Sequence, residues 1–144
     1  MLVETILKEK GSEVVSVPVT TQIQEAAKIL SARRIGSVLV RNEDGGISGI
    51  LSERDIVRGI AEHGAAALAL PVSALMTRDV VFASPSDTLD SVLAVMTERR
   101  FRHLPVLEQG QLVGLISIGD VVKRKIEEVT EEAEGLRAFV QGAG

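Results

Sequence analysis

A serine and an aspartate stand three residues apart at two places in this chain, Ser52 with Asp55 and Ser117 with Asp120. An ionised carboxylate accepts hydrogen bonds through both of its oxygens, so it can hold two vicinal hydroxyl groups. A serine hydroxyl beside the free backbone amides at the start of a helix can meet a phosphate. The two pairs therefore predict two polar sites, each with a carboxylate for hydroxyl groups and a serine for an anion.

Both pairs end the same seven-residue pattern, Gly-apolar-apolar-Ser-x-x-Asp, at residues 49–55 and 114–120. The similarity extends to earlier segments, because residues 23–30 align with residues 89–96. Self-similarity of this kind indicates an internal repeat in which each copy carries one polar site. We therefore expect a pseudo-symmetric fold built from two copies of one unit.

The composition excludes several classes of protein. With 16 Lys+Arg against 20 Asp+Glu, the net charge of -4 gives no general attraction to nucleic acid or to an anionic membrane. Three phenylalanines, with no Trp or Tyr, are too few for a base-stacking surface. The lack of cysteine excludes disulfides and thiolate metal sites. Because the sequence shows neither a signal peptide nor a long apolar run, we expect a cytoplasmic protein.

Hydrophobic periodicity and turn residues predict the same order of elements in each copy, namely strand, helix, strand, strand and helix. The first copy has expected strands at 14–17, 37–40 and 47–51, and expected helices at 23–30 and from 55. The second copy has expected strands at 80–83, 103–107 and 112–116, and expected helices at 89–96 and from 120. The predicted fold class is α/β, with two β-α-β-β-α repeats.

The length of the chain bounds its organisation. A copy of about 60 residues would be marginally stable alone, so the two copies are expected to share a core. We place the first repeat, with a short N-terminal helix and a linker, at residues 1–70, the second at 71–126 and a helical extension at 127–144. Short helices are expected ahead of each copy, at 3–7 and 72–76.

The order of elements and the two motifs resemble the CBS domain, named after cystathionine β-synthase. Specifically, they resemble the tandem pair called a Bateman module, over roughly residues 3–126. The chain looks much like stand-alone bacterial members of this family. The resemblance implies a regulatory module that binds an adenine nucleotide, AMP, ADP, ATP or NAD, with S-adenosylmethionine possible, in clefts between the two repeats. It also implies a homodimer that signals to a separate protein or through oligomerisation.

The resemblance also assigns roles to residues of this sequence. Asp55 and Asp120 are expected to bind ribose, and Ser52 and Ser117 a phosphate. The other residues predicted to line the nucleotide sites are Val15, Val17, Gly36, Ser37, Val38, Thr77, Val81, Leu104 and Pro105. The adenine ring needs an apolar slot with backbone donors and acceptors at its rim, which the strands in this set can supply.

The two sites differ in their basic residues. The second copy has Arg102 and His103 where the first has Gly36 and Ser37, and the first has Arg54 where the second has a glycine. Because phosphates require compensating positive charge, Arg54, Arg102 and His103 are predicted to set the phosphate length that each site accepts. His103 is not expected to bind a metal, since the only other histidine lies in the linker.

An alternative without any ligand explains the same motif. Ser-x-x-Asp at a helix start is close to a capping box, in which the serine caps the helix and the negative charge of the aspartate interacts favourably with the helix dipole. Capping and binding can coexist. The alternative function is therefore a partner-binding or oligomerisation scaffold with vestigial clefts. No catalytic constellation is found, so we do not expect an enzyme.

Residues 118–140 are predicted to form one long helix with an apolar stripe at Val122, Ile126, Val129, Ala133, Leu136 and Val140. Its polar face is acidic, which disfavours binding to a membrane surface. The stripe is expected to pack on its own module or on a second subunit.

Overall fold

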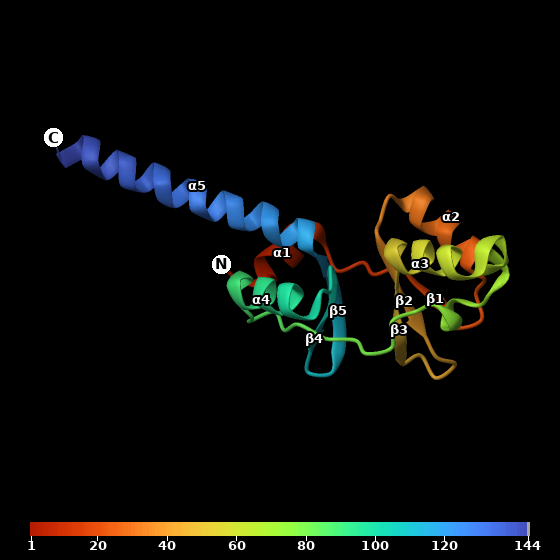
Figure 1. The fold of residues 1–144 in the computed structure, drawn as a ribbon. Coiled ribbons are helices and arrows are strands. Elements are labelled where there is room, and N and C mark those ends of the chain that lie inside the picture. Colours follow the sequence, from red (N-terminus) through yellow and green to blue (C-terminus); the bar gives the residue numbers. More distant parts are fainter. Residues whose placement is uncertain (144) are drawn as a thin grey trace. The chain divides into compact units, whose positions relative to one another are not determined.

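The computed structural model describes residues 1–143, and the side chains of residues 1–142. The chain divides into two compact units. The first-repeat unit comprises Val14–Val80, and the second-repeat unit comprises Met1–Glu13 together with the chain from Val81 onward. Each unit holds one of the two Gly-apolar-apolar-Ser-x-x-Asp patterns (Figure 1).

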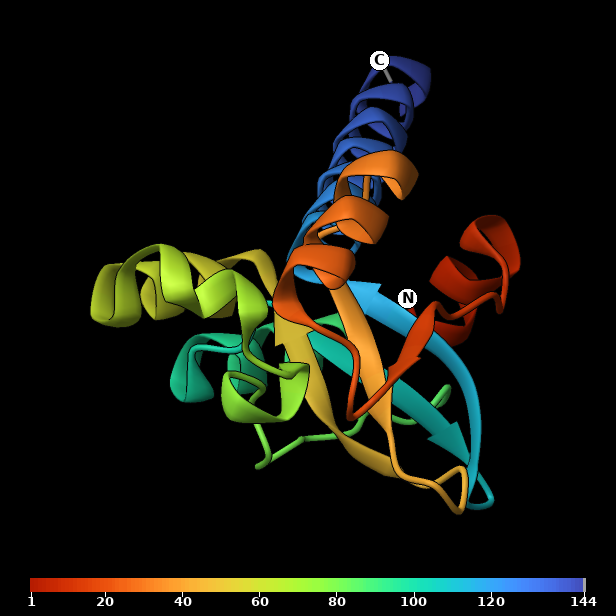
Figure 2. The same cartoon turned by 90° about the vertical axis from the view of Figure 1, so that its right-hand side faces the viewer.

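The first-repeat unit contains a three-stranded sheet in the order β1-β2-β3. β1 pairs in parallel with β2 through a connection that contains α2, and β2 pairs with β3 in an antiparallel hairpin. Figure 2 shows this hairpin, with β2 in orange and β3 in yellow. The elements of this unit are β1 (Ser16–Pro18), α2 (Ile23–Arg33), β2 (Ser37–Arg41), β3 (Ile47–Ser52), α3 (Glu53–His63) and the 3-10 helices η1 (Gly64–Ala69) and η2 (Val72–Ala74).

The second-repeat unit repeats this order with one difference. The strand expected at 80–83 is reduced to a single bridge, in which the Ala83 amide donates to the Pro105 carbonyl at 2.9 Å and the Leu107 amide donates to the Ala83 carbonyl at 2.9 Å. The chain turns on both sides of this bridge, because the Val80 amide donates to the Arg78 carbonyl at 3.0 Å and the Asp87 side chain accepts from the Ser84 amide at 2.8 Å. The elements of this unit are α1 (Val3–Lys10), α4 (Leu89–Arg99), β4 (His103–Glu108), β5 (Gln111–Ser117) and α5 (Ile118–Ala143).

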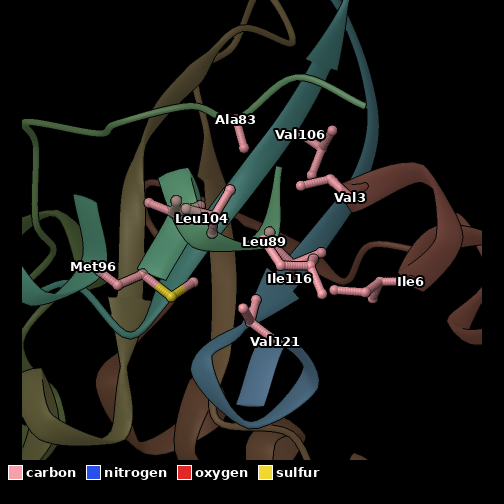
Figure 3. Packing of buried hydrophobic residues seen from close by; sticks show 10 residues of the cluster. Val3, Ile6, Ala83, Leu89, Met96, Leu104, Val106, Ile116 and Val121 are labelled. Atoms are coloured by element: carbon pink, nitrogen blue, oxygen red, sulfur yellow. The ribbon is translucent and has the colours of Figure 1, made fainter. Parts of the chain in front are cut away.

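Each unit has an apolar core of its own. The core of the second-repeat unit combines α4, β4 and β5 with residues from α1 and from the start of α5 (Figure 3). Its buried residues include Val3, Ile6, Leu89, Met96, Leu104, Ile116 and Val121. Removal of one such side chain from water contributes about 1.5–3 kcal/mol, so α1 is an integral part of this unit.

The short segments ahead of the two copies are exchanged between the units. α1 precedes the first copy in sequence but packs in the core of the second-repeat unit, while Val72 and Met76, just before the second copy, are buried in the first-repeat unit. The segment expected as a helix at 72–76 forms only the short 3-10 helix η2.

The exchange explains the glycine of each motif. A Cβ at Gly49 would lie 2.6 Å from the Thr77 carbonyl oxygen, and a Cβ at Gly114 would lie 2.4 Å from Cδ2 of Leu7. Both glycines therefore let an exchanged segment approach the strand closely. Leu7 belongs to α1 and Thr77 follows η2. In each unit, therefore, the motif glycine lies against the segment that precedes the other copy in the sequence.

Candidate functional site

The Ser52–Asp55 pair forms a complete capping box at the start of α3. The Asp55 amide donates to Ser52 Oγ at 3.3 Å, and the Ser52 amide donates back to Asp55 Oδ2 at 2.9 Å. The other carboxylate oxygen, Oδ1, accepts from Arg58 Nη2 at 2.6 Å and from Thr77 Oγ1 at 3.3 Å. Asp55 is only 4% exposed. Both of its oxygens are thus engaged within the first-repeat unit.

The Ser117–Asp120 pair has the same reciprocal bonds at the start of α5. The Asp120 amide donates to Ser117 Oγ at 3.1 Å, and the Ser117 amide donates to Asp120 Oδ2 at 2.9 Å. The capping alternative is therefore realised in both repeats. The capping bond from each serine amide goes to one carboxylate oxygen, Oδ2, so capping by itself does not use the other oxygen.

Asp120 differs from Asp55 in its charged neighbour and in its exposure. Lys10, in the last turn of α1, donates to Asp120 Oδ2 at 2.6 Å and to the Leu115 carbonyl at 2.9 Å. Partial burial opposes ionisation of Asp120, but the hydrogen bonds from Lys10 and from the Ser117 amide outweigh it, so the pKa of this carboxyl lies below its usual value of 3.8. Its side chain keeps 27% exposure, so an ionised carboxylate remains accessible at neutral pH.

The antiparallel hairpins bring further predicted residues to these serines. Ser37 pairs with Ser52 in the β2–β3 register, and His103 pairs with Ser117 in the β4–β5 register. Directly beside these pairs, the Glu53 amide donates to the Gly36 carbonyl at 3.0 Å, and the Ile118 amide donates to the Arg102 carbonyl at 2.8 Å. Two segments more than a dozen residues apart in sequence thus meet at the edge where a helix begins in each repeat.

Ser37 has an unusual environment for a polar residue. It is 3% exposed, and within the described part of the chain its hydroxyl oxygen has no hydrogen-bond partner. A buried hydroxyl without a partner costs free energy, so it marks a place where a further polar group would be favourable. This hydroxyl lies at the start of β2, opposite Ser52.

The remaining predicted residues fall into three groups. Val38, Leu104 and Pro105 are buried in the hairpins, Val17 is buried in β1, and Val15 and Val81 are partly buried against the cores. Thr77 is joined to Asp55. Arg54 and Arg102 are exposed. The structure thus gathers the predicted polar residues at one edge of each sheet, while the two arginines extend into solvent beside those edges.

Sequence reasoning missed two residues of these networks, Lys10 and Arg58. Arg58 has a usable signal, because residues three apart on a helix are neighbours and Asp55 precedes it by three. No local sequence pattern points to Lys10, because it is separated from Asp120 by 110 residues and reaches it only through the packing of α1.

Other surfaces offer different chemistry. A groove of about 550 Å³ lies between α2 and α3 in the first-repeat unit, lined by apolar side chains with Arg34 and Glu53 at its rim. It contains none of the residues predicted for a nucleotide. Within residues 1–143, no group of three or more acidic or histidine side chains is arranged to hold a metal ion, and no helix has the length and apolarity to cross a membrane.

Comparison with solved structures finds the same fold repeatedly. The CBS-domain protein ATU1752 from Agrobacterium tumefaciens is 47% identical, with a TM-score of 0.84 over 86% of this chain and 92% of that one. The CBS domain protein PAE2072 from Pyrobaculum aerophilum, complexed with AMP, is 27% identical, with a TM-score of 0.73 over 83% and 89%. The CBS domain pair of MJ0100, in complex with 5-methylthioadenosine and S-adenosyl-L-methionine, is 25% identical, with a TM-score of 0.77 over 89% and 98%.

Curated relatives agree with this assignment. The CBS domain-containing protein CBSX3, mitochondrial, of Arabidopsis thaliana is 31% identical over 83% of this chain, and CBSCBSPB1 from the same plant is 30% identical over 96%. The chain spans only 60% of the length of the former and 26% of the latter. The family model of the CBS domain matches twice, at residues 7–62 and 72–127. The chain therefore belongs to the CBS-domain family and carries a tandem pair of CBS domains.

Proposed function

We propose that this CBS pair is an adenine-nucleotide-binding regulatory module. The observation that carries the proposal is the carboxylate that each repeat holds in the first turn of a helix, beside a serine hydroxyl and the end of a strand hairpin. Relatives with this fold are complexed with AMP and with S-adenosyl-L-methionine. Both ligands contain an adenosine, whose ribose presents the two vicinal hydroxyls that such a carboxylate can accept.

In the second-repeat unit, Asp120 is the ribose-binding group. Its carboxylate is ionised and partly exposed, and Lys10 and the Ser117 amide hold it in place. Ribose hydroxyls donate to the carboxylate, while the backbone amides at the start of α5 and the Ser117 hydroxyl donate to phosphate. Arg102 lies at the same edge of the hairpin and supplies charge compensation for an anionic ligand.

In the first-repeat unit, Ser37 is the polar group that lacks a partner. Asp55 already accepts from Arg58 and Thr77, so it can bind ribose only by giving up one of these bonds. We propose that a nucleotide here uses the Ser37 hydroxyl, with exposed Arg54 beside the start of α3 for its phosphates. The two repeats therefore form unequal sites. Placement of the ligand in clefts between the repeats remains a prediction from the family resemblance.

Regulation requires that the ligand distinguishes two arrangements of the protein. A nucleotide shifts such an equilibrium only by the difference in its affinity for the two arrangements. We propose that the output passes to a separate protein or through oligomerisation. The alternative function is a scaffold that binds no ligand. It is favoured only if the Ser-x-x-Asp motif serves solely to cap the two helices.

Thermal unfolding with added nucleotide separates these two functions. AMP, ATP, NAD and S-adenosylmethionine are added in turn, and the ligand that binds is expected to raise the stability by about 2.7 kcal/mol at 100 times its Kd. Inosine monophosphate, which lacks the exocyclic amine, and ribose 5-phosphate serve as controls. The absence of any shift with all four ligands, in protein with a cooperative unfolding transition, would rule out the sensor function.

Ser37→Ala tests the first-repeat site. The substitution removes a buried hydroxyl without a partner, so the free protein is expected to keep or gain stability, by about 1 kcal/mol. If the hydroxyl binds a nucleotide, the same variant loses affinity, and titration calorimetry is expected to detect one site fewer or a weaker one. Ser16→Ala, at an exposed position of the same sheet, is the matched control. Unchanged affinity and stoichiometry in Ser37→Ala would remove Ser37 from the site.

A further inference from the structure

The last helix of the chain carries an apolar stripe with a strict spacing. Val122, Ile126, Val129, Ala133, Leu136 and Val140 follow one another at intervals of four, three, four, three and four residues. This is the a/d pattern of a coiled coil, which repeats every 3.5 residues on average. In heptad terms, Ile126, Ala133 and Val140 occupy a positions, and Val122, Val129 and Leu136 occupy d positions. We call these six residues the α5 seam.

The α5 seam does not face the body of its own unit. The body contacts come from other residues of the helix: Val121 is fully buried, Arg124 pairs with Glu9, and Lys125 pairs with Asp90 at 3.0 Å. The side chains of the α5 seam are exposed to solvent instead. Ile126 is 61%, Val129 51%, Leu136 66% and Val140 62% exposed. Figure 1 shows α5 continuing well past α1 and α4, the helices against which it begins.

Exposed apolar side chains in a continuous row are unfavourable in water unless another surface covers them. The residues that flank the α5 seam indicate what that surface is. Glu132 occupies a g position and Arg137 the following e position, the pair that meets across a parallel two-stranded coiled coil. Two copies of this helix, side by side and parallel, therefore form two Glu132–Arg137 ion pairs, one on each side of the seam.

The antiparallel arrangement is less favourable. In the register that keeps all six layers, Lys123 of one helix faces Arg137 of the other, so like charges meet at both ends. In the same register Glu132 faces Glu132 of the other helix and Lys125 faces Phe139, so no pair of opposite charges compensates. The parallel arrangement has no such conflict.

We propose that the α5 seam binds the same helix of a second copy of this chain, as a parallel two-stranded coiled coil in register. The outer positions agree with this assignment, because Glu127, Glu131 and Glu134 occupy b and f positions and remain in water. Gly135 lies at an outer c position, where an added Cβ would meet nothing within 4 Å, so it weakens the helix but does not interrupt the seam.

Cysteine crosslinking tests both the partner and the direction. The chain has no cysteine, so a single substitution on the seam gives a clean signal. Leu136→Cys places two thiols opposite each other only in a parallel, in-register pair, and mild oxidation is expected to convert most of the protein to a covalent dimer. Glu134→Cys, on the outer face, is the control and is expected to remain uncrosslinked. Equal crosslinking of the two variants, or none at Leu136→Cys, would overturn the proposal.

Mass measurement provides the second test. Leu136→Asp places a charge in the seam, so the dimer is expected to dissociate and the mass measured in solution to fall by half. The stability of the two cores is expected to stay unchanged, because Leu136 is exposed. Glu132→Arg is expected to weaken association, and the double exchange Glu132→Arg with Arg137→Glu is expected to restore it. A wild-type monomer, or an unchanged mass in Leu136→Asp, would show that the seam does not join two copies.

Discussion

Asp120→Ala is expected to weaken nucleotide binding at the second-repeat site by at least a hundredfold. A carboxylate that accepts two ribose hydroxyls forms two charge-assisted hydrogen bonds, each worth about 1.5–3 kcal/mol, and about 1.4 kcal/mol corresponds to a factor of ten in Kd. Because the pKa of Asp120 is lowered, this carboxylate is ionised at neutral pH and needs no deprotonation to bind. Titration calorimetry with the nucleotide that gives the largest thermal shift measures the loss.

Lys10→Ala is the matched control for Asp120→Ala. It removes the same ion pair but leaves the carboxylate, so it reproduces any effect of the pair on stability, while affinity is expected to fall much less than in Asp120→Ala because the Ser117 amide still holds the carboxylate. Asp120→Asn, which keeps the shape and loses the charge, is expected to bind more weakly than the wild type. Full affinity and stoichiometry in Asp120→Ala would mean that Asp120 only caps α5.

Asp55→Ala is expected to lower the free energy of unfolding by about 2–3 kcal/mol. The substitution removes the aspartate half of the capping box and its negative charge in the first turn of α3, and it leaves the Ser52 amide and the Thr77 hydroxyl without this acceptor in a largely buried place. The Arg58 pair adds little, because the Arg58 side chain is 62% exposed and water screens it. Chemical denaturation monitored by circular dichroism measures the difference.

Arg58→Ala serves as the control for Asp55→Ala, since it removes the exposed partner alone and is expected to cost less than about 1 kcal/mol. Asp120→Ala is expected to cost less stability than Asp55→Ala, because Asp120 is more exposed. If the two alanine variants lose equal stability and equal affinity, the carboxylates are equivalent and the asymmetry between the repeats is wrong.

These two predictions rest on a difference that the repeated motif conceals. Ser52–Asp55 and Ser117–Asp120 have the same spacing and the same capping bonds, yet one carboxylate is enclosed by its own unit and the other faces a lysine from α1. The basic residues Arg54, Arg102 and His103, which the sequence already showed to be unequal, lie at these same edges. Ligand choice in a CBS pair can thus differ between repeats that look alike in their motifs.

Local patterns predicted most elements of the fold correctly. The apolar spacing at 23–30 and 89–96 identified α2 and α4, and the glycine-bearing turns identified both hairpins. The strand at 80–83 was wrong apart from one bridge, because apolar residues favour a strand but only a turn-free chain can continue the pairing. The resemblance to CBS pairs is confirmed by the family match. Like the secondary-structure elements, it could be recognised in the sequence because it depends on short-range patterns.

The sequence by itself determined the repeat, the family, most of the elements and the serine–aspartate pairs, since each of these is recorded in short local patterns. Tertiary structure alone decided which segment packs with which repeat. It placed α1 against the second copy, and so put Lys10 on Asp120 across 110 residues. It also left Ser37 without a partner and the α5 seam in water. Such facts depend on packing between distant segments, which no local spacing records.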